Sequence, residues 1–104
     1  PKRVSGETAL CVYRIAQEAL TNAIKHAGAD SIEICLEYDS GALRLSVRDN
    51  GLGFDHADAL TASSLGLSSM RERAQLVGGS LSIHSQPSKG TTVSVVVPFD
   101  GSSG

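Results

Sequence analysis

The chain has 104 residues, of which 40% are hydrophobic and 19% are charged, so it can bury one hydrophobic core but not two. Its net charge of -2 and its scattered basic residues argue against a nucleic-acid or anionic membrane surface, because phosphate groups require clustered Lys and Arg. Cys11 and Cys35 lack the spacing of a zinc site or a disulfide framework. We therefore expect a reducing, cytoplasmic location and one domain over residues 1–99, with residues 100–104 as a linker or an artificial tail.

A long helix is predicted from about Glu7 to Ala27, with Ser5 as a possible N-cap and Gly28 as a left-handed stop. Because successive residues turn by about 100°, its apolar residues gather on one side, which we expect to face the core. The members of this stripe are Leu10, Tyr13, Ala16, Leu20, Ala23, Ile24 and Ala27.

A second side of the same helix carries Glu18, Asn22, Lys25 and His26. Side chains three and four residues apart are neighbours on a helix, so a carboxylate, an amide, an ammonium and an imidazole can converge on one small volume. The simplest interpretation of such a group is a solvated polar face. The Asn favours a functional interpretation, because Asn is a weak helix former that a surface helix does not need in its middle.

Four later segments, 31–38, 42–49, 81–85 and 91–97, alternate apolar and polar residues, which is typical of strands with one buried face. A second helix begins near Leu67 and ends at the glycines after Val77. Because the second face of each strand is polar, the helices must share one side of the sheet. We therefore predict an α+β fold: a two-layer sandwich with a mixed, mostly antiparallel sheet and helices on one face.

The alternation in the second strand places Asp49 on the core-facing side, at the strand end. A buried carboxylate is costly unless it accepts hydrogen bonds. Amides of the following loop could supply them, or the amino group of a ligand could. Gly51 and Gly53 come directly afterwards and allow the backbone to turn sharply and approach a ligand closely.

Three further features are compatible with a nucleotide. The 50–64 segment is a long loop without a strong period, and such loops are usually functional. Gly66 and Leu67 open the second helix, and helix N-termini bind phosphate. Thr91, after Gly90, could offer a hydroxyl, although a plain β-turn is the favoured interpretation of this feature taken alone. No Walker loop or dinucleotide fingerprint is present.

The order and spacing of these motifs resemble the ATP-binding domain of sensor histidine kinases. Residues 18–27 (EALTNAIKHA) resemble the N box, residues 49–54 (DNGLGF) the G1 box, and residues 66–79 the G2 region. The segments QEALTNAIKHA and MRERA are similar to those of the subgroup that signals to nitrate- and degradation-type helix-turn-helix response regulators.

The resemblance implies the Bergerat ATP-binding fold, which gyrase and Hsp90 share, with ATP and Mg²⁺ as cofactors. In that family the residue at Asn22 coordinates Mg²⁺, and the residue at Lys25 contacts phosphate. Asp49 accepts the adenine amino group, and Thr91 reaches the adenine through water. Glu18 stands where relatives hold a catalytic base, or an orienting carboxylate. The other residues implied at the nucleotide are His26, Gly51, Gly53, Gly66 and Leu67.

The chain shows no helix pair that could carry a phosphorylated histidine, because His26, His56 and His84 lie in the N box, the loop and a strand. The resemblance therefore implies a protein-histidine kinase fragment that donates the γ-phosphoryl group of Mg-ATP to an upstream dimerisation and phosphotransfer domain. A downstream helix-turn-helix response regulator would then be its partner. We expect no direct membrane contact by this domain, although a longer parent could carry an anchor.

Two other hypotheses stay open at this point. One is a single-domain serine kinase of the same fold that binds and inhibits a sigma factor. The MRERA segment argues against this hypothesis. The other is an interaction module that binds no nucleotide, which the presence of Glu18, Asn22 and Asp49 disfavours.

Overall fold

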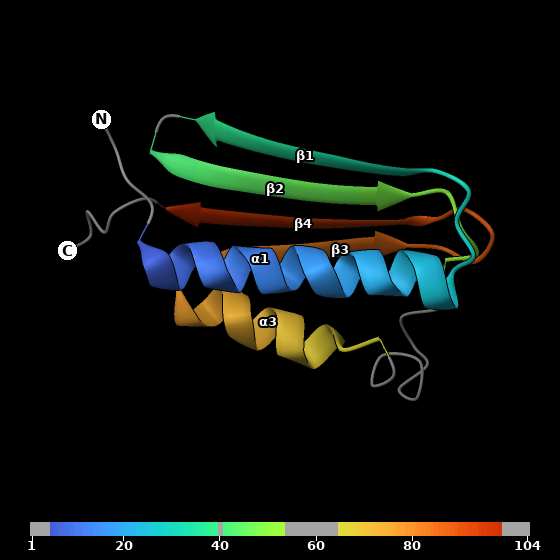
Figure 1. Ribbon diagram of the computed structural model, residues 1–104, viewed down its shortest axis with the longest axis horizontal. Coiled ribbons are helices and arrows are strands. Elements are labelled where there is room, and N and C mark those ends of the chain that lie inside the picture. Colours follow the sequence, from blue (N-terminus) through green and yellow to red (C-terminus); the bar gives the residue numbers. More distant parts are fainter. Residues whose placement is uncertain (1–4, 40, 54–64, 99–104) are drawn as a thin grey trace.

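One antiparallel sheet of four strands carries two helices on one of its faces (Figure 1). The structure is a computed structural model and describes residues 5–39, 41–53 and 65–98. Within these ranges the strand order is β1-β2-β4-β3, and every pairing is antiparallel. The predicted two-layer α+β sandwich is thus confirmed, without a parallel pair among the described strands. The elements are α1 (Gly6–Thr21), η1 (Asn22–His26), β1 (Ile32–Asp39), β2 (Ala42–Asp49), α3 (Leu67–Leu76), β3 (Ser80–Ser85) and β4 (Thr91–Pro98).

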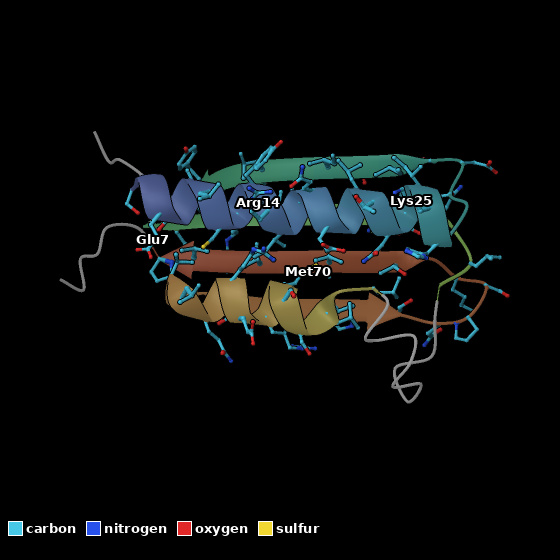
Figure 2. All side chains as sticks on the ribbon, turned by 60° about the horizontal axis from the view of Figure 1, so that its bottom comes forward. Glu7, Arg14, Lys25 and Met70 are labelled. Carbon is cyan, nitrogen blue, oxygen red and sulfur yellow. The ribbon has the colours of Figure 1, made fainter. Side chains whose placement is uncertain are left out.

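The hydrophobic core lies between the sheet and the two helices. In the central strands, buried residues face one another across the ladder, for example Leu45 and Val95. Helix α1 contributes Ile15 and α3 contributes Met70, both fully buried, and Figure 2 shows Met70 between α1 and α3. Each such side chain stabilises the fold by about 1.5–3 kcal/mol. The core therefore holds the ends of β2 and β4 rigidly beneath α1.

Helix α1 begins as predicted and ends in an unusual way. The Ser5 hydroxyl accepts a hydrogen bond from the Thr8 amide at 3.0 Å, which is an N-cap. At the other end the Ala27 amide donates to the Asn22 carbonyl at 2.9 Å, five residues back, so the last turn is a π-helix. Such turns are rare and frequently occur at functional sites. Gly28 comes next with φ +58 and ends the helix in the left-handed conformation that we predicted.

The predicted core-facing side of α1 is only partly correct, because Ala16 and Ala23 of the predicted stripe do pack into the core while other members do not. Leu10, Tyr13 and Ile24 are 55%, 60% and 64% exposed, whereas Ile15 and Ala19 are buried. Apolar residues occur around almost the whole circumference of this helix, so the periodicity does not single out one direction. The helix packs against α3 as well as against β2 and β4, and small residues allow this close approach. The full set of buried α1 and η1 residues is Cys11, Val12, Ile15, Ala19 and Ala23.

The inner face of β1 was also predicted to be buried, and this is correct only for Ile32, which is partly buried against the core. Ile34 pairs with Val47 of β2, so it points to the helix side of the sheet. Nevertheless Ile34, Leu36 and Tyr38 are 50%, 55% and 65% exposed. The reason is that β1 is an edge strand, while the main helix contacts fall on β2, β4 and β3. Alternation identifies the face of a strand but not whether a helix covers it.

In the part of the chain that the structure describes, no helix has both the length and the apolar character that crossing a membrane requires.

Candidate functional site

A pocket lies where β2 ends and β4 begins. Because these strands are antiparallel neighbours, Asp49 at the end of β2 pairs with Thr91 at the start of β4, and both line the pocket. Asn22 and His26 of η1 form the opposite wall. The cavity volume is about 270 Å³. Its remaining lining is apolar apart from Gly53 and consists of Ala19, Ala27, Val47, Leu65, Leu67, Ile83 and Val93.

Asp49 occupies the position that the strand alternation predicts. It is 9% exposed and is the buried charged residue of the described core. The amide of Gly51 donates a hydrogen bond to Asp49 Oδ1 at 2.8 Å. A loop amide therefore satisfies part of the hydrogen-bonding capacity of the carboxylate, which is one of the two alternatives that the sequence predicted. The carboxylate also borders the cavity, so it can accept a hydrogen bond from a ligand there.

Asn22 presents an oxygen atom that has no partner among the described residues. Its amide nitrogen Nδ2 donates to the Leu65 carbonyl at 2.8 Å, which fixes the orientation of the side chain because a carbonyl can only accept. The other amide atom, Oδ1, is buried and without a hydrogen bond. Leaving a buried acceptor unsatisfied costs about 1–3 kcal/mol. A donor, a water or a cation at this point would remove that cost.

The π turn determines which of the predicted helix residues reach the pocket. Each residue of this wider turn advances less around the axis than the 100° of an α-helix. Asn22 and His26 line the cavity, but Lys25 is exposed near the helix end and does not (Figure 2). Glu18 is half-buried and lies beside Gly66 instead: a Cβ on that glycine would stand 2.9 Å from Glu18 Oε2. The predicted convergence of all four polar side chains on one volume is therefore only partly correct.

The loop after β2 uses its glycines to pack backbone against backbone. A Cβ on Gly51 would lie 2.5 Å from the Ala27 Cβ, and the Leu52 amide donates to the Ala27 carbonyl at 3.0 Å. Gly53 has φ +68, and a Cβ there would overlap the carbonyl oxygen of Gln86. The absence of side chains at these glycines allows the loop to pack closely against the end of η1 and against the β3–β4 connection. Gly53 borders the pocket, whereas Gly51 and Gly66 do not.

The start of β4 contains a contact that the sequence pattern did not reveal. The Ser85 hydroxyl lies 2.7 Å from the Thr91 hydroxyl and also donates to the Gly90 carbonyl at 3.3 Å. Ser85 comes two residues after Ile83, so the alternation of β3 already places it on the inner face. The later part of the predicted long loop, residues 54–64, and the 100–104 tail lie outside the described residues.

The fold and the pocket define the class: an α+β sandwich that holds a cavity between one helix layer and the ends of antiparallel strands. Residues 7–101 match the family described as histidine kinase-, DNA gyrase B- and HSP90-like ATPases. The chain therefore belongs to this family, among the ATP-binding catalytic domains of sensor histidine kinases.

Several known proteins are similar over nearly the whole chain. The chain is 41% identical to the oxygen sensor histidine kinase NreB of Staphylococcus carnosus over 98 residues, which are 94% of this chain and 28% of that protein. It is 45% identical to the sensor histidine kinase LiaS of Bacillus subtilis over 88 residues, 85% of this chain and 24% of that protein. The chain thus spans about a quarter of the length of these relatives.

Solved structures agree with the fold. The histidine kinase domain of the blue-light activated histidine kinase from Erythrobacter litoralis superposes with a TM-score of 0.77 at 30% identity, covering 91% of this chain and 46% of that one. The ATP binding domain of PrrB from Mycobacterium tuberculosis superposes with a TM-score of 0.71 at 25% identity, covering 86% and 68%.

Proposed function

We propose that this chain is the catalytic part of a two-component sensor kinase. It binds Mg-ATP and donates the γ-phosphoryl group to a histidine on a dimerisation and phosphotransfer domain elsewhere in its parent protein. The observation that supports this proposal is a pocket with a buried carboxylate, Asp49, on one wall and, on the other, an amide oxygen, Asn22 Oδ1, for which the described residues supply no hydrogen-bond partner. The similarity to NreB and the MRERA segment support the nitrate- and degradation-type subgroup, with a helix-turn-helix response regulator as the downstream partner.

The Asp49 side of the pocket is the proposed adenine site. A carboxylate accepts hydrogen bonds from an exocyclic amine, and Val47, Ile83 and Val93 beside it offer apolar surface to the flat base. Thr91 stands next to Asp49 on the neighbouring strand and reaches the base through water. This wall therefore recognises the base, and the phosphates extend toward η1.

The Asn22 side of the pocket fits Mg²⁺. Mg²⁺ keeps several waters and takes few protein oxygens together with substrate phosphates, and Asn22 Oδ1 is a buried amide oxygen without a described partner. Among the described residues no group of three or more His, Cys, Asp or Glu side chains could hold a metal. The described residues therefore allow a Mg²⁺ site in which Asn22 gives one amide oxygen and the nucleotide gives phosphate oxygens. When bound, Mg²⁺ would neutralise developing phosphate charge.

The chain's own residues contribute position and charge, which is most of what phosphoryl transfer needs. The N-terminal amides of α3, directly after Gly66, are proposed to hold phosphate oxygens. Lys25 is exposed on η1, and its flexible side chain is proposed to meet the phosphate charge. Glu18 is proposed to orient the incoming histidine or to take its proton.

The experiment that tests the proposal is a calorimetric titration of this chain with a non-hydrolysable ATP analogue, with Mg²⁺ and with a chelator. We expect binding that tightens when Mg²⁺ is present. An absence of binding under both conditions would overturn the proposal and leave the interaction module as the alternative.

Replacing Asn22 with Ala is expected to weaken nucleotide binding about tenfold when Mg²⁺ is present, and much less in a chelator. The reason is that the variant loses the metal-facing oxygen, a polar contact with a charged group worth about 1.5–3 kcal/mol. The same titration measures both affinities. Gln75→Ala, which removes an exposed amide from α3, is the matched control and should change neither. An unaltered Mg²⁺ dependence in Asn22→Ala would remove Asn22 from the metal site.

A further inference from the structure

We propose that the sheet edge at β1 binds one more strand, which the parent protein supplies from outside this chain and which alternates apolar and basic residues. The site is the backbone of Ile32–Asp39 on the side that faces away from β2. Strand addition is a general mode of recognition, in which backbone hydrogen bonds give affinity and alternate side chains give specificity. The inference goes beyond the proposed function, because neither ATP nor Mg²⁺ takes part in it.

The starting observation is that β1 lacks the usual protection of an edge strand. Soluble proteins normally protect sheet edges with Pro, Lys, bulges, very short strands or a covering helix. All eight residues of β1 pair with β2 in one unbroken register, so no bulge interrupts the strand, and its sequence contains neither Pro nor Lys. In an antiparallel ladder every second residue directs its amide and carbonyl away from the neighbouring strand. Half of β1 therefore presents backbone groups to which a further strand can bind.

The opposite edge of the sheet, at β3, is protected. β3 is shorter, with six residues, α3 packs against it, and its inner residue Ile83 is 8% exposed. β1 is the strand farthest from both helices in Figure 1, and its inner residues Ile34 and Leu36 are half-exposed, although the β2 residues that they pair with are buried. The apolar layer of the sheet thus continues onto β1 without a cover, and apolar side chains of an added strand would extend it.

The outer face of β1 determines the charge of the added strand. Glu33 and Glu37 are exposed on this face and stand opposite Arg48 and Arg44 of β2. Opposite charges on neighbouring strands stabilise a sheet, and like charges destabilise it. Lys or Arg at the outer positions of the added strand would continue the alternation of charge from β2 through β1. The strand that fits is therefore apolar on the inner face and basic on the outer face.

A second copy of this chain does not carry that pattern. The exposed outer residues of its own β1 are Glu33, Cys35 and Glu37, so two β1 edges would bring acidic residues together without a base between them. The parent protein is the better source. The matched segment is only 28% of the relative NreB, and the proposed function already places a phosphotransfer domain elsewhere in the parent. We therefore assign the added strand to the parent protein.

The first test adds a synthetic peptide of alternating Lys and Val residues, as long as β1, and follows amide hydrogen exchange of this chain by NMR. Binding should slow the exchange of every second β1 amide, those that point away from β2, about tenfold or more. The matched peptide with Glu in place of Lys should bind about tenfold more weakly, because attraction to Glu33 and Glu37 becomes repulsion. Equal affinity of the two peptides, or no protection of these amides, would overturn the proposal.

Leu36→Lys tests the inner face of β1. A charge that points inward is one of the devices by which edge strands avoid further pairing, so the affinity for the Lys-Val peptide should fall about tenfold or more. Leu76→Lys makes the same change at an exposed leucine of α3 and should bind like the native chain. If Leu36→Lys does not fold, Leu36→Thr replaces it, since Thr suits a strand, and a smaller loss of about threefold is expected. Native affinity in the folded Leu36 variant would contradict the proposal.

The second test repeats the exchange measurement on the parent protein, in which the alternate β1 amides should already be protected and the peptide should not bind. Three results would overturn the assignment. The amides could exchange as fast in the parent as in this chain, or the parent could cover Ile34 without protecting them, as a helix would. Protection could also rise with the concentration of this chain alone, which would identify a second copy. A failure to bind ATP would change none of these expectations, so the two proposals fail independently.

Discussion

Replacing Asp49 with Asn is expected to weaken ATP binding about a hundredfold while the fold stays intact. The asparagine oxygen can still accept the Gly51 amide, which now donates to Asp49 Oδ1 at 2.8 Å. The other oxygen becomes an NH₂ group, so a donor then faces the donor on the base. A hydrogen bond to a charged group contributes about 1.5–3 kcal/mol, and the opposed donors place the loss at the upper end of that range.

Calorimetry with a non-hydrolysable ATP analogue measures this loss, and thermal unfolding of the free variant checks the fold. Asp30→Asn makes the same chemical change at an exposed position and should leave the affinity unchanged. If Asp49→Asn bound as tightly as the native chain, the carboxylate would serve the loop alone and the adenine site would lie elsewhere.

Replacing Gly90 with Ala is expected to cost about 4 kcal/mol or more, which is a large part of the stability of about 5–15 kcal/mol typical of a small domain. Gly90 has φ +84, and a Cβ there would overlap the carbonyl oxygen of Asp49 and lie 3.2 Å from the Asn50 Cα. These are backbone atoms of the β2 end, which the core holds in place. The clash therefore cannot be relieved by rotating a side chain.

Gly78 provides the matched comparison, because it has φ +70 and a Cβ added to it would meet nothing within 4 Å. Gly78→Ala should cost only the strain of the left-handed conformation, about 1–2 kcal/mol. Urea unfolding followed by circular dichroism measures both variants. Equal losses would show that the contact between Gly90 and the β2 end yields easily and does not constrain the pocket.

The sheet was predictable from the sequence because apolar and polar residues alternate along β2 and, apart from Val96, along β4. The same alternation placed Asp49 on the inner face at the strand end, where the structure has it. The orientation of α1 was not predictable, since leucines, isoleucines and alanines surround that helix and only tertiary packing selects among them. Ile34 and Leu36 of β1 were predicted to be buried but are exposed. The alternation shows that they share the inner face of the sheet, and the position of the helices decides whether that face is covered.

Several residues of the pocket were predictable because their side chains have a distinct chemical character: an amide, an imidazole, a carboxylate and a hydroxyl. Asn22, His26, Asp49 and Thr91 line the cavity as predicted. Further predicted residues that line it are Gly53 and Leu67, whereas Glu18, Lys25, Gly51 and Gly66 do not.

The remaining differences have two physical causes. A π turn cannot be read from α-helical spacing, so the directions of Lys25 and His26 were not determined by the sequence pattern. The hydroxyl oxygens of Ser85 and Thr91 lie 2.7 Å apart, and such a contact becomes visible only when the two strands are paired.

The π turn also bears on how this chain can change its length during evolution. Five residues, Asn22–His26, occupy the wide turn, and the Ala27 carbonyl at its end holds the Leu52 amide. Deletion of one of these residues would let the segment close into a regular α-helix in which the Ala27 amide still donates to the Asn22 carbonyl, now four residues back, so Ala27 would keep its direction and its contact with the loop after β2. Insertion of a further residue has no such outlet and would rotate Ala27 by about 100° away from that loop. This helix end should therefore tolerate the loss of one residue better than the gain of one.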